Sequence, residues 1–496
     1  MTHRNPAAVA AASFLLLTGA VITAAPGAHA GTPGGTRAVD RGSDFDGDGY
    51  ADVLIGAPTG TDGGCGNAGY VTVQYGGPRG IGTAGGAREA RTAVFGQNTP
   101  GVPGGAESGD GFGAAVAGRD LNADGYDDAI VTAPGEDVGD VKDAGRATVL
   151  FGSRTGLRAS GGVAFGAATP RADAGFGLAV AAARLSGATP GDMLAVADRQ
   201  GAHLFTHAAG ALRPAGRLDT VGAPGDERIQ PASLTTGDYD DDGYADLIVA
   251  GRSLEEDGTG RSAVYRGGAG GPTYVRDLPG GPATASGDID HDGYDDLVAG
   301  RPDRLEDEYE PLTGGTVLVY LGGPQGFADA DLYGTPDQVW AQYTPGVPGT
   351  AELGDAFGYD VSLGDADGDG FADLAVGVPG EDVGTVRDAG TVVVLRGSAR
   401  GLTATGAVSF TQNTAHVPGT VEKGDRFGAQ VRFADTDRDG RAGLLATAPG
   451  ENSADGAAWH VPGSAAGPVT RGSWSYGPRS LAAPPADARF GTAVDE

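Results

Sequence analysis

The chain has 496 residues, with 65 acidic against 34 basic side chains and a formal net charge of -31 at pH 7. This charge excludes nucleic acid as a partner, because phosphate binding needs a basic face that releases counterions, and it favours divalent cations. Ninety-two glycines and an aromatic content of 7% argue against long helices, so the turn signals between short β-prone runs predict an all-β fold.

The first 30 residues have the pattern of a secretory signal peptide. Arg4 precedes an apolar stretch from Ala8 to Ala25, and Ala28-His29-Ala30 supplies a small-residue cleavage signal. We therefore expect a secreted, extracellular protein that is cleaved near Ala30, with a flexible mature N-terminus at 31–40 and one repeat domain over 41–496. No later segment has the roughly 18 apolar residues that membrane insertion requires. The only cysteine, Cys65, cannot form an internal disulfide.

A nine-residue acidic loop that leads into an apolar run occurs six times in the chain. The first copy is Asp44-Phe45-Asp46-Gly47-Asp48-Gly49-Tyr50-Ala51-Asp52, followed by Val53-Leu54-Ile55, and the other copies begin at Asp120, Asp238, Asp288, Asp365 and Asp435. The gap between Asp120 and Asp238 is about twice the others. The segment from Arg184 to Asp192, followed by Met193-Leu194-Ala195-Val196, fits the missing seventh unit. Seven units of roughly 65 residues predict blades or solenoid coils of four strands each.

A Phe-Gly pair precedes several of these loops by about eight residues, and its distribution indicates how the units close. The pairs begin at Phe112, Phe176, Phe357, Phe427 and Phe490, and the last has no acidic loop after it. Conversely, the loop at Asp44 has no Phe-Gly pair before it. Both oddities are explained if Phe490 to Asp495 completes the first unit. We therefore predict a seven-bladed β-propeller closed by pairing of its N- and C-terminal segments, with a decayed linear array as the alternative.

These marks resemble the FG-GAP repeat propeller found at the N-terminus of integrin α chains and in many secreted bacterial proteins. They stand here as Phe357-Gly358, the loop from Asp365 to Asp373, and Val376-Gly377-Val378-Pro379-Gly380, while Gly56-Ala57-Pro58 matches the final motif fully. The resemblance covers nearly the whole mature chain. It implies an integrin α-like scaffold, here with neither the inserted ligand-binding domain nor the leg domains of integrin α chains.

The acidic loops have the ligand pattern of a calcium site. Side-chain oxygens at positions 1, 3, 5 and 9 and a backbone carbonyl at position 7 suit a hard cation that takes six to eight oxygen ligands. An EF-hand would need a Glu at position 12 between helices, whereas Ile55 stands there in a strand-like run. A plain Asp-Gly turn would not explain the acids at positions 1, 3 and 9. Without a cation, the carboxylates of one loop would repel by on the order of 1 kcal/mol per pair.

Five loops carry a full ligand set and one is weakened. The predicted calcium ligands are Asp44, Asp46, Asp48, Tyr50 and Asp52; Asp120, Asn122, Asp124, Tyr126 and Asp128; Asp238, Asp240, Asp242, Tyr244 and Asp246; Asp288, Asp290, Asp292, Tyr294 and Asp296; Asp365, Asp367, Asp369, Phe371 and Asp373; and the weakened set Asp435, Asp437 and Asp439. Position 7 supplies only its carbonyl, so its ring is free to pack against the blade. Gly443 replaces the ninth-position acid of the last loop. The Arg184 unit keeps only Asp192, and we expect no metal there, with Arg184 as a candidate internal cation.

A third element, Thr99-Pro100-Gly101-Val102-Pro103-Gly104, recurs at Thr344 and, altered, at Thr414. Each copy leads to an acid pair, which is Glu107 with Asp110, Glu352 with Asp355, or Glu422 with Asp425, and the same three units carry Pro-Gly-Glu at Pro134, Pro379 and Pro449. These loops either form a partner-binding rim or are turn chemistry inherited by duplication.

The leading functional hypothesis is a calcium-binding adhesion or ligand-binding module for an extracellular protein or glycan. The alternatives are a structural component of the cell-surface matrix and an extracellular propeller hydrolase or lyase that would use Glu107, Glu352 or Glu422. No catalytic motif is present: there is no nucleophile elbow, and His203 and His207 lack both the intervening Glu and the helix of a zinc protease. We therefore expect no enzyme activity. Neither the ligand nor the oligomeric state follows from the sequence.

Overall fold

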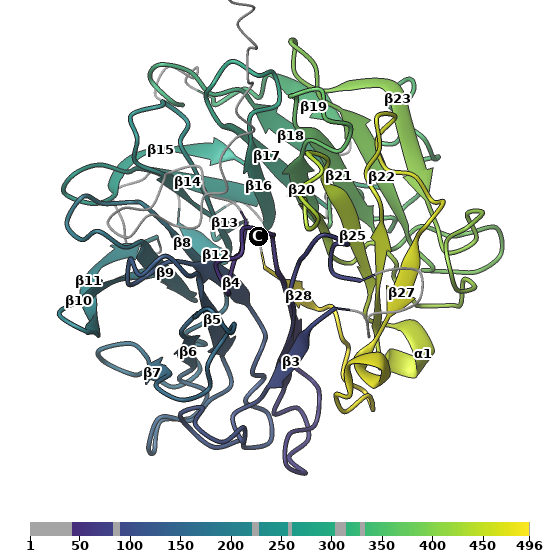
Figure 1. The fold of residues 1–496 in the computed structure, drawn as a ribbon. Helices are drawn as coiled ribbons and strands as arrows, with labels where there is room; N and C mark the ends of the chain where they lie inside the picture. The colour runs from purple at the N-terminus through teal and green to yellow at the C-terminus, as the bar shows by residue number, and fades with distance from the viewer. Residues whose placement is uncertain are drawn as a thin grey trace, which may run out of the picture.

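The computed structural model describes residues 42–82, 90–220, 228–255, 260–302, 314–327 and 333–495. In these residues the chain forms seven four-stranded antiparallel sheets arranged as blades around a central axis (Figure 1), which confirms the predicted seven-bladed propeller. The predicted signal peptide and the segment 31–40 lie outside the described residues. Within the described part of the chain, no helix is long and apolar enough to cross a membrane.

Blades 2 to 7 each use four consecutive strands, numbered from the centre of the ring outward. Their strands are β4 (Val116–Arg119), β5 (Asp128–Ala133), β6 (Arg146–Leu150), β7 (Val163–Phe165); β8 (Val180–Ala183), β9 (Met193–Asp198), β10 (Gly201–Ala208), β11 (Ala211–Asp219); β12 (Ile229–Gly237), β13 (Asp246–Ser253), β14 (Gly260–Arg266), β15 (Thr273–Pro279); β16 (Ala283–Gly287), β17 (Asp296–Arg301), β18 (Thr316–Tyr320), β19 (Gln338–Trp340); β20 (Val361–Gly364), β21 (Asp373–Val378), β22 (Thr391–Arg396), β23 (Thr403–Phe410); and β24 (Val431–Ala434), β25 (Gly443–Ala448), β26 (Ala457–Val461), β27 (Trp474–Tyr476). Two short helical turns, α1 (Glu451–Ala454) and η2 (Pro478–Leu481), complete the fold.

Blade 1 is assembled from both ends of the chain. Its strands β1 (Val53–Ala57), β2 (Tyr70–Gln74) and β3 (Thr92–Phe95) are joined at the inner edge by β28 (Ala493–Val494), which pairs with β1. The C-terminus consequently lies at the centre of the ring (Figure 1). The predicted closure is therefore confirmed, and it leaves no open sheet edge at the seam of the ring.

The closure is held by a buried cluster around Asp495, which is fully buried. Its carboxylate accepts hydrogen bonds from Ser43 Oγ at 2.5 Å, from the Leu54 main-chain nitrogen at 2.8 Å and from Arg432 Nη1 at 2.8 Å. Arg432 lies on β24 of blade 7 and is also buried. The two ends of the chain are thus tied to each other and to the neighbouring blade.

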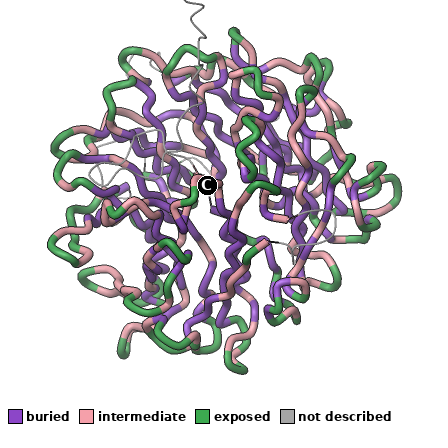
Figure 2. Tube along the Cα trace, in the orientation of Figure 1, coloured by how far each residue is buried: buried purple, intermediate pink, exposed green. Residues whose placement is uncertain are grey.

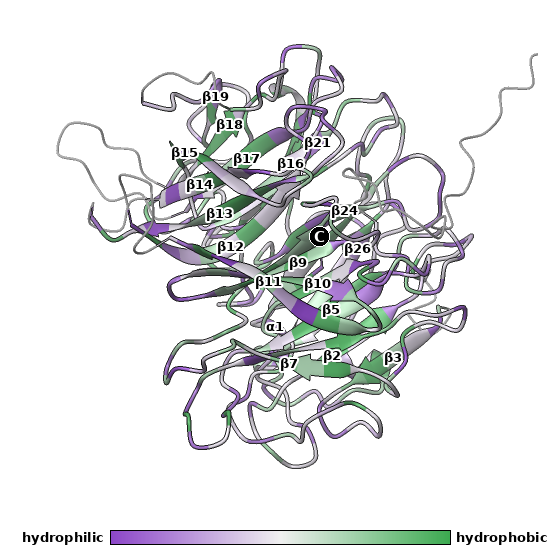
Figure 3. Cartoon of the chain, turned by 90° about the vertical axis from the view of Figure 1, so that its left-hand side faces the viewer, coloured by the Kyte–Doolittle hydropathy of each residue, from purple (hydrophilic) through white to green (hydrophobic). Residues whose placement is uncertain are grey.

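The hydrophobic core lies between blades. The strands that follow the acidic loops, such as β5 and β25, are buried along their whole length (Figure 2), because both faces of each sheet are covered by neighbouring sheets. This agrees with the apolar runs of the sequence, which occupy the second strand of each blade, one place out from the centre. In the side view of Figure 3, strands such as β2 and β13 are correspondingly hydrophobic.

The Phe-Gly pairs fasten adjacent blades. Phe112 is almost fully buried and forms a parallel bridge to Gly69 of blade 1, and its main-chain nitrogen donates to Ala68 O at 2.8 Å. Gly113 has φ +92°, and a Cβ there would lie 2.8 Å from Tyr70 O, so a side chain would be both strained and crowded. Phe490 makes the same bridge to Gly456, as the closed ring requires.

Candidate metal sites and the opposite loop face

The acidic loops lie on one face of the ring. In blades 2 and 4 to 7 each loop connects the innermost strand of a blade to the second strand, and in blade 1 the loop leads into the second strand β1, whose inner neighbour β28 comes from the C-terminus. The ninth-position Asp opens the second strand in blades 2, 4, 5 and 6. Because successive strands run antiparallel, the turns between second and third strands, and the connections from one blade to the next, lie on the other face. The acidic-loop face and the opposite face are therefore built from different sequence elements.

Backbone amides fold each acidic loop around its first and last carboxylates. In blade 1, Asp44 accepts hydrogen bonds from the main-chain nitrogens of Asp48 at 3.1 Å and Gly49 at 2.8 Å. The Asp52 carboxylate accepts from the main-chain nitrogens of Phe45 and Gly76, both at 2.8 Å. Gly49 has φ +86°, which explains the glycine at position 6.

The side-chain oxygens at position 3 of the acidic loops indicate that these loops suit a cation. Asn122 Oδ1 and Asp290 Oδ1 are buried, yet neither has a hydrogen-bond partner among the described residues. A buried acceptor without a partner costs about 1–3 kcal/mol. Both atoms are oxygens at the position where the sequence predicts a ligand, so the loops fit a hard cation such as calcium.

Five loops bring three carboxylates together, with ligand atoms within 4.8 Å of one another. These groups are Asp44, Asp46 and Asp48; Asp238, Asp240 and Asp242; Asp288, Asp290 and Asp296; Asp365, Asp367 and Asp369; and Asp435, Asp437 and Asp439. Of the ninth-position acids, only Asp296 joins its group. The loop at Asp120 has the same backbone hydrogen bonds, but one of its predicted ligands is the amide of Asn122.

The carboxylates of these loops resist ionisation in the absence of a cation. Burial, with a smaller contribution from neighbouring carboxylates, raises the pKa of Asp246 and of Asp296 to about 7. Burial likewise raises the pKa of Asp44 to about 6. A bound divalent cation would remove this penalty by neutralising the acids.

The position-7 rings pack against the loop of a neighbouring blade. The ring of Tyr126 lies 2.7 Å from where a Cβ of Gly47 would be, so glycine is needed there. The ring of Phe371 meets that of His291 edge-on, with centroids 5.8 Å apart. The rings thus connect successive acidic loops around the ring, while their carbonyls remain the predicted metal ligands.

In three blades an arginine from outside the acidic loop contacts an acid of that loop, and sequence reasoning missed these arginines. Arg396 Nη1 lies 3.1 Å from Asp367 and 2.7 Å from Asp373 in blade 6. Arg266 contacts Asp240 in blade 4, and Arg91 contacts Asp46 in blade 1. Arg266 and Arg396 each end the third strand of their blade, a positional signal that the sequence offered. In these loops the guanidinium already neutralises part of the charge that a metal would take.

Blades 3 and 7 depart from the pattern as the sequence indicated. Arg184 lies over the ring of Tyr244 at 5.7 Å, which gives its guanidinium an aromatic contact. The hypothesis that Arg184 neutralises Asp192 stays a prediction. In blade 7, His460 Nε2 lies 2.6 Å from where a Cβ of Gly443 would be, so the imidazole fills the space of the lost ninth-position acid.

The two histidines of blade 3 lie on a strand. His203 and His207 are both on β10, and His203 Nε2 lies 3.0 Å from the Asp198 carboxylate. Burial opposes ionisation of Asp198, but the hydrogen bond from His203 and nearby positive charge hold its pKa at about 2. This arrangement is an ion-paired structural cluster and agrees with the expectation that no zinc helix is present.

On the opposite face, the two acids of each pair in the third sequence element differ in burial. Asp110, Asp355 and Asp425 are buried, whereas Glu107, Glu352 and Glu422 are exposed. Each buried Asp meets the Glu of a Pro-Gly-Glu turn and a Gln from the preceding blade. Gln97 Nε2 donates to Glu136 at 2.6 Å, and Gln342 Nε2 donates to Glu381 at 2.7 Å. Sequence reasoning did not identify these glutamines.

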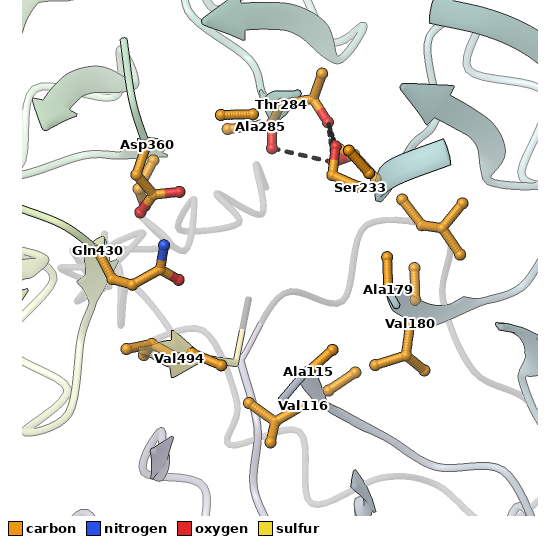
Figure 4. A pocket seen from close by; sticks show the side chains of 18 of the residues that line it. Ala115, Val116, Ala179, Val180, Ser233, Thr284, Ala285, Asp360, Gln430 and Val494 are labelled. Atoms are coloured by element: carbon orange, nitrogen blue, oxygen red, sulfur yellow. Dashed lines mark hydrogen bonds between the residues drawn. The ribbon is translucent and has the colours of Figure 1, made fainter. Parts of the chain in front are cut away.

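A central cavity of about 490 Å³ runs between the innermost strands. Small side chains such as Ala115, Val116 and Ala179 line one part of it, and the hydroxyls of Ser233 and Thr284, 3.2 Å apart, line another (Figure 4). Asp360 accepts a hydrogen bond from the Val431 main-chain nitrogen at 2.7 Å, and burial raises its pKa to about 7.

Comparison with known proteins identifies the repeats. The sequence model of the FG-GAP repeat family matches residues 35–73, 112–150, 280–320 and 357–395. These segments belong to blades 1, 2, 5 and 6. The comparison with curated proteins gave no match.

Proposed function

With four FG-GAP repeats in its sequence and seven blades in its ring, this chain belongs to the FG-GAP repeat proteins, and we propose that it is a secreted, calcium-stabilised module that binds an extracellular protein or glycan. An FG-GAP propeller indicates a ligand-binding scaffold. The proposal adds three specific statements: that the protein is secreted, that it binds calcium and that it has an integrin α-like role in adhesion. Each rests on its own observations and has its own test.

The observation that carries the binding proposal is that three apolar side chains of one connection on the opposite face are exposed. Tyr343, Leu353 and Tyr359 are 47%, 75% and 41% exposed, and all three lie on the connection between blades 5 and 6. We call them the blade 5–6 patch. Exposed tyrosines combine a large apolar ring with a polar tip and are enriched where proteins contact partners.

The equivalent positions in the related blades do not carry this character. Blade 2 has Asn98, Ser108 and Ala114 in the places of Tyr343, Leu353 and Tyr359. The connections share the same turn motif, so the motif alone does not require large apolar groups. The guanidinium of Arg426, from the neighbouring blade, lies 5.9 Å from the Tyr359 ring and adds a positive charge beside the patch. This composition suits a partner that offers both apolar surface and acceptor groups.

Calcium has a structural part in this proposal. The carboxylates at positions 1, 3, 5 and 9 and the carbonyl at position 7 would hold the ion, which would neutralise the acids and stiffen one end of each blade. The chain's own residues fix the geometry through the amide hydrogen bonds to the first and last carboxylates. The patch lies on the other face, so calcium would support binding without contacting the partner.

The binding proposal is tested by retention on cell-wall fractions and on a glycan array, with calcium and with EGTA. We expect selective retention in calcium, lost in the variant Leu353→Ser/Tyr359→Ser. The matched control is Tyr333→Ser, because Tyr333 is 80% exposed but lies between β18 and β19, on the acidic-loop face. Failure of every ligand to bind, or an equal loss in the control, would refute the proposal.

Secretion is tested separately from binding. The full chain, expressed with its own N-terminus in a bacterial host, should be recovered from the medium with a mature N-terminus near Gly31. Retention of the intact chain inside the cells would contradict this part of the proposal.

A further inference from the structure

The central cavity has a layer of side chains at the end nearest the opposite face. These side chains stand five residues before the first position of each acidic loop or, in blade 3, five residues before Arg184. Blades 2 to 7 supply small or polar residues to this layer, namely Ala115, Ala179, Ser233, Ala283, Asp360 and Gln430. Asp360 is its only charged member. Figure 4 shows Asp360 and Gln430 directed into the cavity from neighbouring blades.

A second layer lies at the other end of the innermost strands, one residue before each acidic loop. Arg119 occupies this place in blade 2, and it lines the cavity with only 7% of its surface exposed. Blades 3 to 7 have only glycine or alanine there, namely Ala183, Gly237, Gly287, Gly364 and Ala434. Arg119 is therefore the one large side chain of this layer, and its neighbours leave room for a guanidinium group.

Arg119 has no acidic partner among the described residues. Its Nη1 donates to Gly118 O at 2.6 Å, while Nε is buried and has no hydrogen-bond partner. A buried guanidinium without a counter-charge costs several kcal/mol. Two other arginines line the cavity, but Arg432 is paired with Asp495 and Arg252 is exposed. This end of the cavity therefore suits an anionic group.

Asp360 likewise has no positively charged partner among the described residues. Its carboxylate accepts a hydrogen bond from the Val431 main-chain nitrogen at 2.7 Å. Burial raises its pKa to about 7, and no charged side chain contributes to this shift. Gln430 Nε2 donates to Ala429 O at 2.9 Å, which leaves the amide oxygen of Gln430 as an acceptor beside Asp360. This end of the cavity therefore suits an ammonium group.

The walls between the two charges suit a short aliphatic chain. Ala115, Val116 and Ala179 line one side of the cavity with methyl groups (Figure 4). The volume of about 490 Å³ falls in the range of small-molecule sites. Tyr359, which is 41% exposed, also lines the cavity, so a ligand can enter from the opposite face.

We propose that the central cavity binds a small zwitterion, with its ammonium group at Asp360 and its carboxylate at Arg119. A ligand with a single charge would leave one of these two residues unpaired, and a free anion would also meet the net charge of -31. The two layers are four residues apart, which is about 13 Å along a strand. Hydrogen bonds of about 3 Å at each end leave on the order of 7 Å between the two charges of the ligand.

Calorimetric titration with three probes of one chain length tests this proposal. The probes are ε-aminocaproate, which is a zwitterion, hexylamine, which is a cation, and hexanoate, which is an anion. The titrations are made at saturating calcium and at about pH 8, above the pKa of Asp360. We expect ε-aminocaproate to bind roughly tenfold or more tightly than either other probe, because only the zwitterion makes charge-assisted hydrogen bonds at both ends.

Four single variants decide which residues hold the probe. Asp360→Asn should weaken ε-aminocaproate roughly tenfold and bind hexanoate no more weakly than the wild type. Arg119→Met should also weaken ε-aminocaproate but bind hexylamine no more weakly. Ala179→Leu, which narrows the apolar wall without changing a charge, should weaken the zwitterion. The matched control is Glu352→Gln, which removes an exposed acid of the same face and should have no effect.

Two results would overturn the proposal. One is a wild-type protein that binds ε-aminocaproate no better than hexylamine or hexanoate. The other is an affinity for ε-aminocaproate that is the same in Asp360→Asn as in the wild type. Neither result would bear on retention of a macromolecular ligand through Leu353 of the blade 5–6 patch.

Discussion

Removal of the Asp495 carboxylate should be among the most destabilising single changes in the chain. This side chain is fully buried, and it joins Ser43 near the N-terminus, Leu54 on β1 and Arg432 on β24. In Asp495→Leu, the guanidinium of Arg432, itself 3% exposed, would lose its counter-charge. Because the acid is the hub of the closure, the effect should exceed that of a typical core substitution.

The expected magnitude follows from the contacts that are lost. Breaking a buried ion pair by removing one partner costs about 3–5 kcal/mol, mostly because the other charge remains buried. Asp495→Asn keeps an oxygen for the Leu54 amide and should cost less, about 1–3 kcal/mol. Replacing both partners, in Asp495→Leu/Arg432→Leu, removes the uncompensated charge. The double variant should therefore be no less stable than the worse single variant.

Equilibrium unfolding in urea at saturating calcium measures these differences, provided that the unfolding is reversible. The wild type, Asp495→Leu, Arg432→Leu and the double variant form a double-mutant cycle, and we expect a coupling free energy of about 2 kcal/mol or more. A coupling below about 0.5 kcal/mol would show that the ion pair does not act as a unit. Costs that simply add in the double variant would therefore refute this account of ring closure.

Three further predictions concern metal and pH. Chelation with excess EGTA should lower the melting temperature, since each native-only site at 100 Kd adds about 2.7 kcal/mol; an unchanged melting temperature would contradict the structural role of calcium. Arg396→Gln should tighten calcium binding in blade 6, because Asp367 and Asp373 lose an internal cation; calorimetric titration that shows no change would refute the competition. Burial lowers the pKa of His460 to about 4. The unfolded chain therefore takes up this proton first, and stability should fall between about pH 6.5 and 4 by about 3 kcal/mol, an effect absent from His460→Gln.

The sequence predicted the blade count and the ring closure because both are written in local, periodic marks. Each acidic loop and each Phe-Gly pair is specified within a few residues. The unmatched pair at Phe490 could be assigned to the first unit, because the loop at Asp44 has no Phe-Gly pair before it. The same reasoning could not rank the metal sites. Asp367 and Arg396 are far apart in the chain, and their contact depends on where the third strand of the blade ends.

The glutamine-acid clusters were missed for a related reason, although the sequence contained a signal. Gln97 and Glu136, Gln342 and Glu381, and Gln412 and Glu451 are each 39 residues apart. A constant separation across three repeats marks a contact between blades, whereas the shorter spacing within Glu107 and Asp110 suggested an acid pair. The structure separates that pair, because the Asp turns inward and the Glu remains exposed.

The unevenness of the ring therefore has a physical interpretation on both faces. Where an arginine can reach the acids, as Arg396 does in blade 6 and Arg146 does in blade 2, the charge is balanced within the chain. Where it cannot, as at Asp290, a buried carboxylate oxygen is left without a hydrogen-bond partner among the described residues. Duplication supplied identical acidic positions, and later substitution decided which blades carry their own cation. Dependence on metal should accordingly be concentrated in the blades that lack such an arginine.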